Sequence, residues 1–201
     1  MIKLIGVVGA GQMGNGIAHV CAASGYNVKL LDVNQDAIER GLKTITGNLD
    51  RQIAKNLLTA EQKAATLARI SIGLDYAFFG DCDLVIEASP ENEALKREIF
   101  KKLCPHLKAD ALVASNTSSI SITRLAAMTD RPAKFIGMHF MNPVPVMKLV
   151  EIIRGIATSE DTFKSIRDLT QRLGKNAAVA EDFPAFIVNR ILLPMINEAV
   201  Y

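Results

Sequence analysis

The apolar residues near the start of the chain follow two patterns. Residues 2–8 form a short, nearly continuous apolar run, as expected for a parallel strand that is covered on both faces. Helical spacing follows over residues 13–24, and a second apolar strand is predicted over residues 27–31. This order of strand, helix and strand predicts the first unit of a parallel α/β sheet.

A long helical excursion follows the second strand. From about residue 35 the apolar residues at helical spacing form one stripe, made of Ile38, Leu42, Ile45, Leu49, Ile53 and Leu57. Residues 59–62 (TAEQ) have the pattern of a helix cap, so a second helix is predicted from there to about residue 67. Such a hairpin is larger than a crossover needs and could close over a ligand; a merely solvated charged face is the alternative.

The alternation of strands and helices then resumes. Further strands are predicted over residues 70–72, 84–87, 111–114 and 176–180, and further helices over 92–103 and 158–175. The whole pattern is α/β and predicts a Rossmann-type, doubly wound sheet with a helical-hairpin excursion.

The first strand leads directly into the glycine motif Gly9-Ala10-Gly11-Gln12-Met13-Gly14. In this context Gly9 permits a tight turn, Gly11 lets the backbone approach a pyrophosphate, and Gly14 lets the helix pack on the strand. The helix amino terminus attracts phosphate groups. A glycine-rich turn without any ligand is the alternative, and it leaves the acidic residue after the second strand unexplained. The loop residues are therefore predicted to bind a dinucleotide.

That acidic residue, Asp32, favours one dinucleotide over another. A carboxylate at the end of the second strand accepts hydrogen bonds from both hydroxyls of an adenosine ribose. No arginine follows within the next few residues to hold a 2′-phosphate, and the carboxylate would repel that phosphate. We therefore expect NAD rather than NADP as the cofactor.

A domain boundary is predicted at residues 181–184 (EDFP). Residues 1–183 would form the NAD-binding Rossmann domain, and residues 184–201 the start of an all-α domain. Residues 188–201 are apolar and helical without a carboxy-terminal cap, so we expect the chain to be a fragment of a longer protein. Its last helix should then expose apolar side chains, among them Ile191, Leu192, Met195 and Ile196.

Composition fits an enzyme domain that is soluble in the cytoplasm. The chain has 201 residues, of which 49% are hydrophobic and 22% charged, with a formal net charge of +2. No basic stripe interleaved with aromatic residues suggests nucleic acid, and no apolar stretch approaches the length of a membrane span. The cysteines Cys21, Cys82 and Cys104 are far apart in the sequence, so we expect neither a disulfide nor a metal site.

Polar residues follow two of the predicted strands. Residues 87–91 and 115–119 begin where the strands end, so both segments should face the same crevice as the glycine loop. The hydroxyl groups of Ser118, Ser119 and Ser121 are also typical helix caps, an explanation that suffices for one or two of them.

The segment IGMHFMNPVP, with the carboxylate that follows it, has the layout of an oriented general base. His139 stands just before a proline-stiffened loop, and Glu151 follows soon after. A carboxylate that fixes the tautomer of an imidazole and stabilises the imidazolium lets the ring exchange a proton with a substrate alcohol. A core histidine beside a buried strand is an equally good explanation of this segment taken alone.

Several long motifs along the whole chain resemble those of one family. They are GAGQMGNGIA, VIEASPENEALK, ASNTSS, GMHFMNPVPVMKLVEII and DFPAFIVNRILLPMINEA. With them the chain resembles the L-3-hydroxyacyl-CoA dehydrogenase family, and within it the short bacterial 3-hydroxybutyryl-CoA dehydrogenases.

The resemblance implies a role for each matching position. It implies His139 as catalytic base, Glu151 as the acid that orients it, and Ser118 and Asn189 as contacts of the reacting substrate. Along the cofactor it implies Asp32 at the adenosine ribose and, on the nicotinamide half, Glu91, Lys96 and Asn116. An exposed helix lysine is the alternative for Lys96. Asn48 and Lys55 of the helical excursion match positions that meet coenzyme A, which favours ligand binding there over a solvated face.

The implied reaction is the reversible NAD-dependent oxidation of a 3-hydroxyacyl-CoA, within fatty acid or butanoate metabolism, in a protein that is a homodimer when the helical domain is present. Acyl chain length and physiological direction stay open. One departure is Ala185, which stands where the familiar motif has glycine. Two alternatives remain: a sugar-acid (gulonate-type) dehydrogenase of the same superfamily, and a catalytically silent NADH-binding protein.

Overall fold

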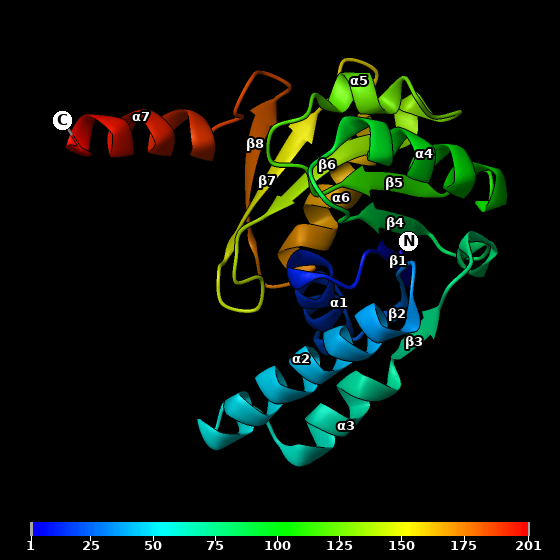
Figure 1. Cartoon of the computed structure of the whole chain (residues 1–201), viewed down its shortest axis with the longest axis vertical. Helices are drawn as coiled ribbons and strands as arrows, with labels where there is room; N and C mark the ends of the chain where they lie inside the picture. Colours follow the sequence, from blue (N-terminus) through cyan, green and yellow to red (C-terminus); the bar gives the residue numbers. More distant parts are fainter. Residues whose placement is uncertain (1, 201) are drawn as a thin grey trace.

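The computed structural model describes residues 2–200 and contains a single large sheet flanked by helices (Figure 1). The strands are β1 (Leu4–Val8), β2 (Asn27–Leu31), β3 (Ile70–Gly73), β4 (Leu84–Glu87), β5 (Leu112–Ser115), β6 (Phe135–Phe140), β7 (Leu149–Arg154) and β8 (Asn176–Glu181). The α-helices are α1 (Gln12–Ala23), α2 (Gln35–Ala54), α3 (Ala60–Ala68), α4 (Glu93–Leu103), α5 (Ile122–Ala126), α6 (Glu160–Arg172) and α7 (Val188–Val200). Short 3₁₀ turns are η1 (Tyr76–Phe79), η2 (Cys104–His106) and η3 (Pro132–Lys134).

The strand order is β3-β2-β1-β4-β5-β6-β7-β8. Neighbouring strands run parallel except at one place, where β6 and β7 pair antiparallel. The order reverses between β1 and β4, so the crevice above that point receives the carboxyl ends of both halves of the sheet. The predicted doubly wound sheet is confirmed.

Helices cover both faces of the sheet. One hydrophobic cluster joins the strands to α1, α2 and α6, and a second joins them to α4 and α5. Strand β4 is buried at all its residues, which explains why Leu84, Val85 and Ile86 are all apolar instead of alternating with polar residues. Figure 1 shows the α2–α3 hairpin extending from the edge of the sheet.

The helical hairpin follows the predicted pattern up to its tip. Thr59 caps α3 with a capping box that it forms with Gln62, and Ile38, Ile45 and Leu49 of the stripe are fully buried. Leu57 was wrongly predicted to belong to that stripe: its side chain is 72% exposed, because α2 ends at Ala54 and the turn carries the residue away from the sheet.

Helix α7 projects from one side of the molecule (Figure 1). None of its described residues is buried, and its apolar side chains are exposed, with Ile191 at 63% and Met195 at 57%. Its predicted extension to Tyr201 lies outside the described residues.

Candidate active site

The glycine loop has the geometry that a bound dinucleotide requires. Gly9 has φ +100°, and its amide donates to the Leu31 carbonyl at 2.7 Å, which fixes the turn. A Cβ on Gly14 would stand 1.7 Å from the Gly9 carbonyl oxygen, so only glycine fits there. A Cβ on Gly11 would meet no atom of residues 2–200 within 4 Å. The loop therefore has an open face at the amino terminus of α1, where a pyrophosphate can approach the backbone.

Asp32 lies beside this loop at the end of β2. Its Oδ2 accepts from the Ala10 amide at 2.7 Å, and its Oδ1 accepts from the Val33 amide at 2.6 Å. Because a carboxylate oxygen can accept more than one hydrogen bond, both oxygens stay available to ribose hydroxyls. A cavity of about 640 Å³ connects Asp32 and the glycine loop with Tyr76, which fits the adenosine half of a dinucleotide.

His139 and Glu151 form a buried pair at the opposite side of the crevice. The two residues face each other across the antiparallel β6–β7 register, and His139 Nδ1 lies 2.6 Å from Glu151 Oε2. Glu151 is fully buried and the His139 side chain is 10% exposed. With Nδ1 donating to the carboxylate, Nε2 is the ring atom left to accept a proton from a substrate. The structure thus brings together the predicted base and the acid predicted to orient it.

The other oxygen of Glu151 binds the start of α7. Its Oε1 accepts from the backbone amides of Ile187 at 2.8 Å and Val188 at 2.9 Å. The ring of Phe186 packs beside that of His139, with 6.1 Å between the centroids. These contacts of residues 186–188 with the pair were not predicted from the sequence, which gives no signal for a main-chain donor so far along the chain.

A second cavity, of about 470 Å³, has His139 in its wall. The predicted site residues that line it, besides His139, are Met13, Glu91, Asn116, Ser118 and Asn189. It shares Met13, Ala88 and Ser89 with the cavity at Asp32, so the two form one continuous crevice from Asp32 to His139.

Glu91 organises the serine-rich segment on this wall. Its Oε1 accepts from Thr117 Oγ1 at 2.5 Å and from the amides of Ser118 and Ser119 at 2.9 and 3.0 Å. Burial opposes ionisation, but these hydrogen bonds and the charge of Lys96 outweigh it and hold the pKa of Glu91 below its usual value. Ser118 in turn is tied to α7, because Asn189 Nδ2 donates to its carbonyl at 3.1 Å.

Lys96 is neither exposed nor at the wall of the crevice. Its side chain is 1% exposed, and Nζ donates to Glu87 Oε1 and Oε2 at 2.7 and 2.9 Å. Glu87 also accepts from Ser115 Oγ at 2.6 Å and from Ser89. The alternative of an exposed helix lysine is wrong, because a carboxylate buried at the end of β4 requires a cation. Lys96 Nζ also donates to the Ser89 carbonyl at 3.2 Å and lies 3.7 Å from Glu91 Oε2, so it contacts two residues of the cavity wall without lining the cavity itself.

Asn116 uses its side-chain oxygen within the protein. Oδ1 accepts from the Phe140 amide at 2.9 Å and so holds the end of β6, next to His139. Its side-chain nitrogen has no partner among the described residues and borders the crevice. Asn116 thus links the serine-rich segment to the strand that carries the base.

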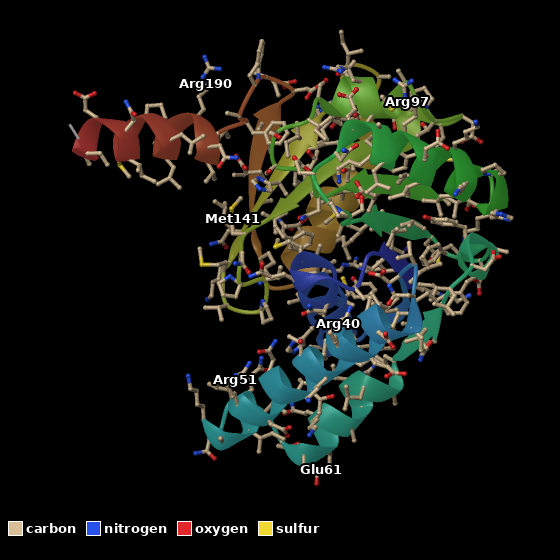
Figure 2. The ribbon with its side chains drawn as sticks, in the orientation of Figure 1. Arg40, Arg51, Glu61, Arg97, Met141 and Arg190 are labelled. Carbon is tan, nitrogen blue, oxygen red and sulfur yellow. The ribbon has the colours of Figure 1, made fainter. Side chains whose placement is uncertain are left out.

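A third cavity lies between α1, α2 and the loop after β6. It measures about 470 Å³ and contains Asn48, Arg40 and Asn142 in its wall. Arg40, labelled in Figure 2, shares the face of α2 with Asn48, which lies about two helical turns further along. The sequence analysis did not include Arg40, although its helical spacing from Asn48 indicates that the two share a face. Lys55 directly follows the last residue of α2; it is exposed and does not line this cavity.

Several features of the described residues bear on other kinds of site. No three His, Cys, Asp or Glu residues among them are grouped so as to hold a metal ion. Nor does any described helix have both the length and the apolar character of a membrane span. The three cysteines are free and buried, and burial raises the pKa of the Cys21 thiol to about 12. These thiols are therefore poor nucleophiles.

Comparison with known proteins decides the family. Residues 4–183 match the family model of the 3-hydroxyacyl-CoA dehydrogenase NAD binding domain. The chain belongs to the 3-hydroxyacyl-CoA dehydrogenase family. Its dinucleotide cofactor is NAD, as predicted.

Individual members of the family are closely similar over the whole chain. The 3-hydroxybutyryl-CoA dehydrogenase of Bradyrhizobium diazoefficiens is 60% identical over 201 residues, which is 100% of this chain and 69% of that protein. The crystal structure of (S)-3-hydroxybutyryl-CoA dehydrogenase from Ralstonia eutropha superposes with a TM-score of 0.97 at 50% identity, covering 99% of this chain and 70% of that one. The human mitochondrial hydroxyacyl-coenzyme A dehydrogenase is 42% identical over 207 residues, covering 100% of this chain and 66% of that protein.

Proposed function

We propose that this dehydrogenase oxidises an L-3-hydroxyacyl-CoA to the 3-ketoacyl-CoA, reversibly, with 3-hydroxybutyryl-CoA as its substrate. The observation that carries the proposal is the 2.6 Å contact between His139 Nδ1 and the fully buried Glu151, at the end of a crevice that begins at the glycine loop and Asp32. The four-carbon substrate is supported by the names of the bacterial relatives.

The residues of the chain divide the work of the reaction. The glycine loop and Asp32 hold the adenosine and pyrophosphate of NAD, whose nicotinamide ring accepts the hydride from substrate C3 when the cofactor is bound. His139 Nε2 takes the proton of the 3-hydroxyl, and Glu151 stabilises the imidazolium that results. In the reverse direction the same nitrogen returns the proton to the oxygen.

Two further side chains orient the substrate in this proposal. Ser118 and Asn189 line the cavity in front of His139 and are tied to each other through the Ser118 carbonyl. Their hydroxyl and amide groups would hold the reacting oxygen near His139 and steady it as its charge changes. The coenzyme A part would run along α2, past Arg40 and Asn48 towards Lys55, since these positive and polar groups suit a phosphorylated ligand.

The proposal extends to the organisation of the protein. We place the domain boundary at residues 183 and 184, supported by the end of the family match at residue 183. The exposed apolar side of α7 would then pack in a helical domain that contributes to a homodimer. Three free buried thiols suit a reducing cytoplasm, where a soluble enzyme of fatty acid or butanoate metabolism works.

The test is loss of NADH absorbance that depends on acetoacetyl-CoA, measured on this chain and on a version extended through a helical domain from a relative. Activity in either version that falls by about 10²- to 10⁴-fold in His139→Ala supports the proposal. A gulonate-type polyol acid is the comparison substrate. If both versions bind NADH and neither oxidises it with the thioester, the proposal fails; turnover of the polyol acid would then identify a sugar-acid dehydrogenase.

A further inference from the structure

The segment that leads into α7 encloses the His139–Glu151 pair on the side away from the sheet. Ala185 and Phe186 both adopt left-handed backbone conformations, with φ of +68° and +49°. Successive left-handed residues other than glycine are unfavourable, so the surrounding contacts must hold this turn in place. Figure 1 shows the segment as the connection between β8 and α7.

The left-handed turn directs two backbone amides at a single oxygen. Ile187 and Val188 both donate to Glu151 Oε1, at 2.8 and 2.9 Å. Glu151 is fully buried, so its oxygens depend on hydrogen bonds from the protein rather than from bulk water. The carboxylate has one oxygen on His139 and the other on the main chain of the turn.

Other contacts fix the position of the same turn. The Phe186 ring is 4% exposed and packs beside His139, and Phe186 N donates to the Phe183 carbonyl at 3.0 Å. Three residues after Phe186, the Asn189 side chain donates to the Ser118 carbonyl at 3.1 Å. The turn therefore contacts the base, its carboxylate and the serine-rich wall of the crevice within five residues.

We propose that the Ile187 and Val188 amides are positioning groups that hold Glu151 on His139, so that the catalytic base is fully oriented only when the start of α7 is in place. A carboxylate held only by the imidazole can rotate about its side-chain torsions. Two amides that donate to Oε1 restrict this rotation, so that Oε2 stays directed at His139 Nδ1. Displacement of α7 withdraws both amides and frees His139 Nδ1. This inference rests on the proposed role of His139 as the base.

The test removes one hydrogen-bond donor without changing any side chain. In the full chain, α-hydroxyisovalerate replaces Val188 by nonsense suppression, which converts the amide that donates to Glu151 into an ester. The matched control is the corresponding ester at Ile191, whose amide donates to the Ile187 carbonyl at 3.1 Å inside α7 and does not touch Glu151. Each ester removes one backbone N–H donor near the start of the same helix, but only the first removes a donor to Glu151.

The first readout is the rate at which the Nδ1 proton of His139 exchanges with water, followed by NMR on histidine-labelled protein. The chain has 3 histidines, so the signal can be assigned by comparison with His139→Gln. We expect exchange to accelerate about tenfold or more in the ester at 188 and to stay within about twofold in the ester at 191. Equal exchange in the two esters, or slower exchange in the first, overturns the inference.

The second readout separates positioning from cofactor binding. The ester at 188 should lower kcat with acetoacetyl-CoA by about tenfold and leave the NADH dissociation constant unchanged. The exchange measurement needs no substrate, so it tests the positioning role even if the thioester is not turned over. Failure of turnover in the unmodified chain would count against the proposed function alone, and an unchanged exchange rate against the positioning role alone.

Discussion

His139 and Glu151 are directly opposed residues of the antiparallel strands β6 and β7, and their side chains meet at 2.6 Å. This is the one antiparallel pairing of the sheet in the described residues. In a parallel pair the two side chains would come from strands joined by a long crossover. Here a short loop joins them, so a base and its carboxylate lie only 12 positions apart in the sequence.

Replacing the carboxylate by an amide should disable the base without disturbing the fold. In Glu151→Gln the side-chain oxygen can still accept from the amides at 187 and 188, but the amide group then faces His139 Nδ1 as a donor. The ring must accept there at Nδ1 and cannot form the imidazolium that Glu151 stabilises, so it can neither take the substrate proton in oxidation nor return it in reduction. We expect kcat to fall by about 10²- to 10⁴-fold in the acetoacetyl-CoA assay. NADH affinity should stay unchanged, and Glu181→Gln, exposed on β8, serves as the control.

The glycine loop allows fold and cofactor binding to be separated. Gly14→Ala places a methyl 1.7 Å from the Gly9 carbonyl oxygen and should destabilise the protein by about 3 kcal/mol or more. Gly11→Ala adds its methyl to open space, so stability should change by less than about 0.5 kcal/mol. That methyl stands on the face which the pyrophosphate approaches, so NADH affinity should fall by about one to two orders of magnitude. Urea unfolding and NADH titration of both variants test the distinction; equal effects on stability would contradict it.

Most helices and strands, and much of the crevice, could be predicted because they depend on sequence patterns within short segments. The Asn27–Leu31 strand and the Thr59 cap depend on neighbouring residues only, and so were predicted at the positions where they occur. The crevice followed from topology, since parallel strands bring their carboxyl ends to one edge. The pairing of His139 with Glu151 was predicted from residue types, but the antiparallel register that produces it was not.

Features that depend on the packed structure could not be predicted from the sequence. The sequence placed Lys96 either at the cofactor or in solvent, and the structure buries it against Glu87, nine residues earlier. The hydrogen bonds from Ile187 and Val188 to Glu151 span 36 and 37 residues and use backbone atoms, which every sequence supplies equally. Leu57 continued an apolar stripe, but the helix ended before it.

The buried ion pair of Lys96 and Glu87 should respond strongly to loss of one partner. Lys96→Met keeps the packing of α4 and leaves the Glu87 carboxylate buried without its cation, which should cost about 3–5 kcal/mol. The double variant Glu87→Gln with Lys96→Met removes the stranded charge and should recover much of that loss. Urea denaturation of the two variants measures both effects. Equal losses in the single and double variants would contradict this account.

Stability should fall in mild acid because of His19. Burial, and then the charge of Lys175, lowers the pKa of His19 to about 4, and its Nδ1 has no hydrogen-bond partner in the part of the chain that the structure describes. The folded protein therefore keeps the ring neutral, while the unfolded chain protonates it near 6.5. This contribution to stability is present above pH 6.5 and is lost as the pH falls towards 4.

Between pH 7.5 and pH 5 the loss from His19 should be about 2 kcal/mol. The measurement is the urea midpoint across that range in the unmodified chain and in His19→Gln, whose side chain does not titrate. The variant should show a flatter dependence on pH, with the difference between the curves confined to that window. Parallel curves would mean that His19 does not titrate differently in the two states.

The left-handed conformation of Ala185 predicts that glycine is tolerated at this position and valine is not. At φ +68° the Cβ is strained, so Ala185→Gly should recover about 1 kcal/mol, offset by the greater freedom of glycine in the unfolded chain. The net change should lie within about 0.5 kcal/mol of zero. Ala185→Val adds a branched Cβ to the same conformation and should cost more than about 1 kcal/mol. Because the strained turn carries the amides that hold Glu151, the valine variant should also lose kcat, whereas Ala64→Val, exposed on α3, should lose neither kcat nor more than about 0.5 kcal/mol.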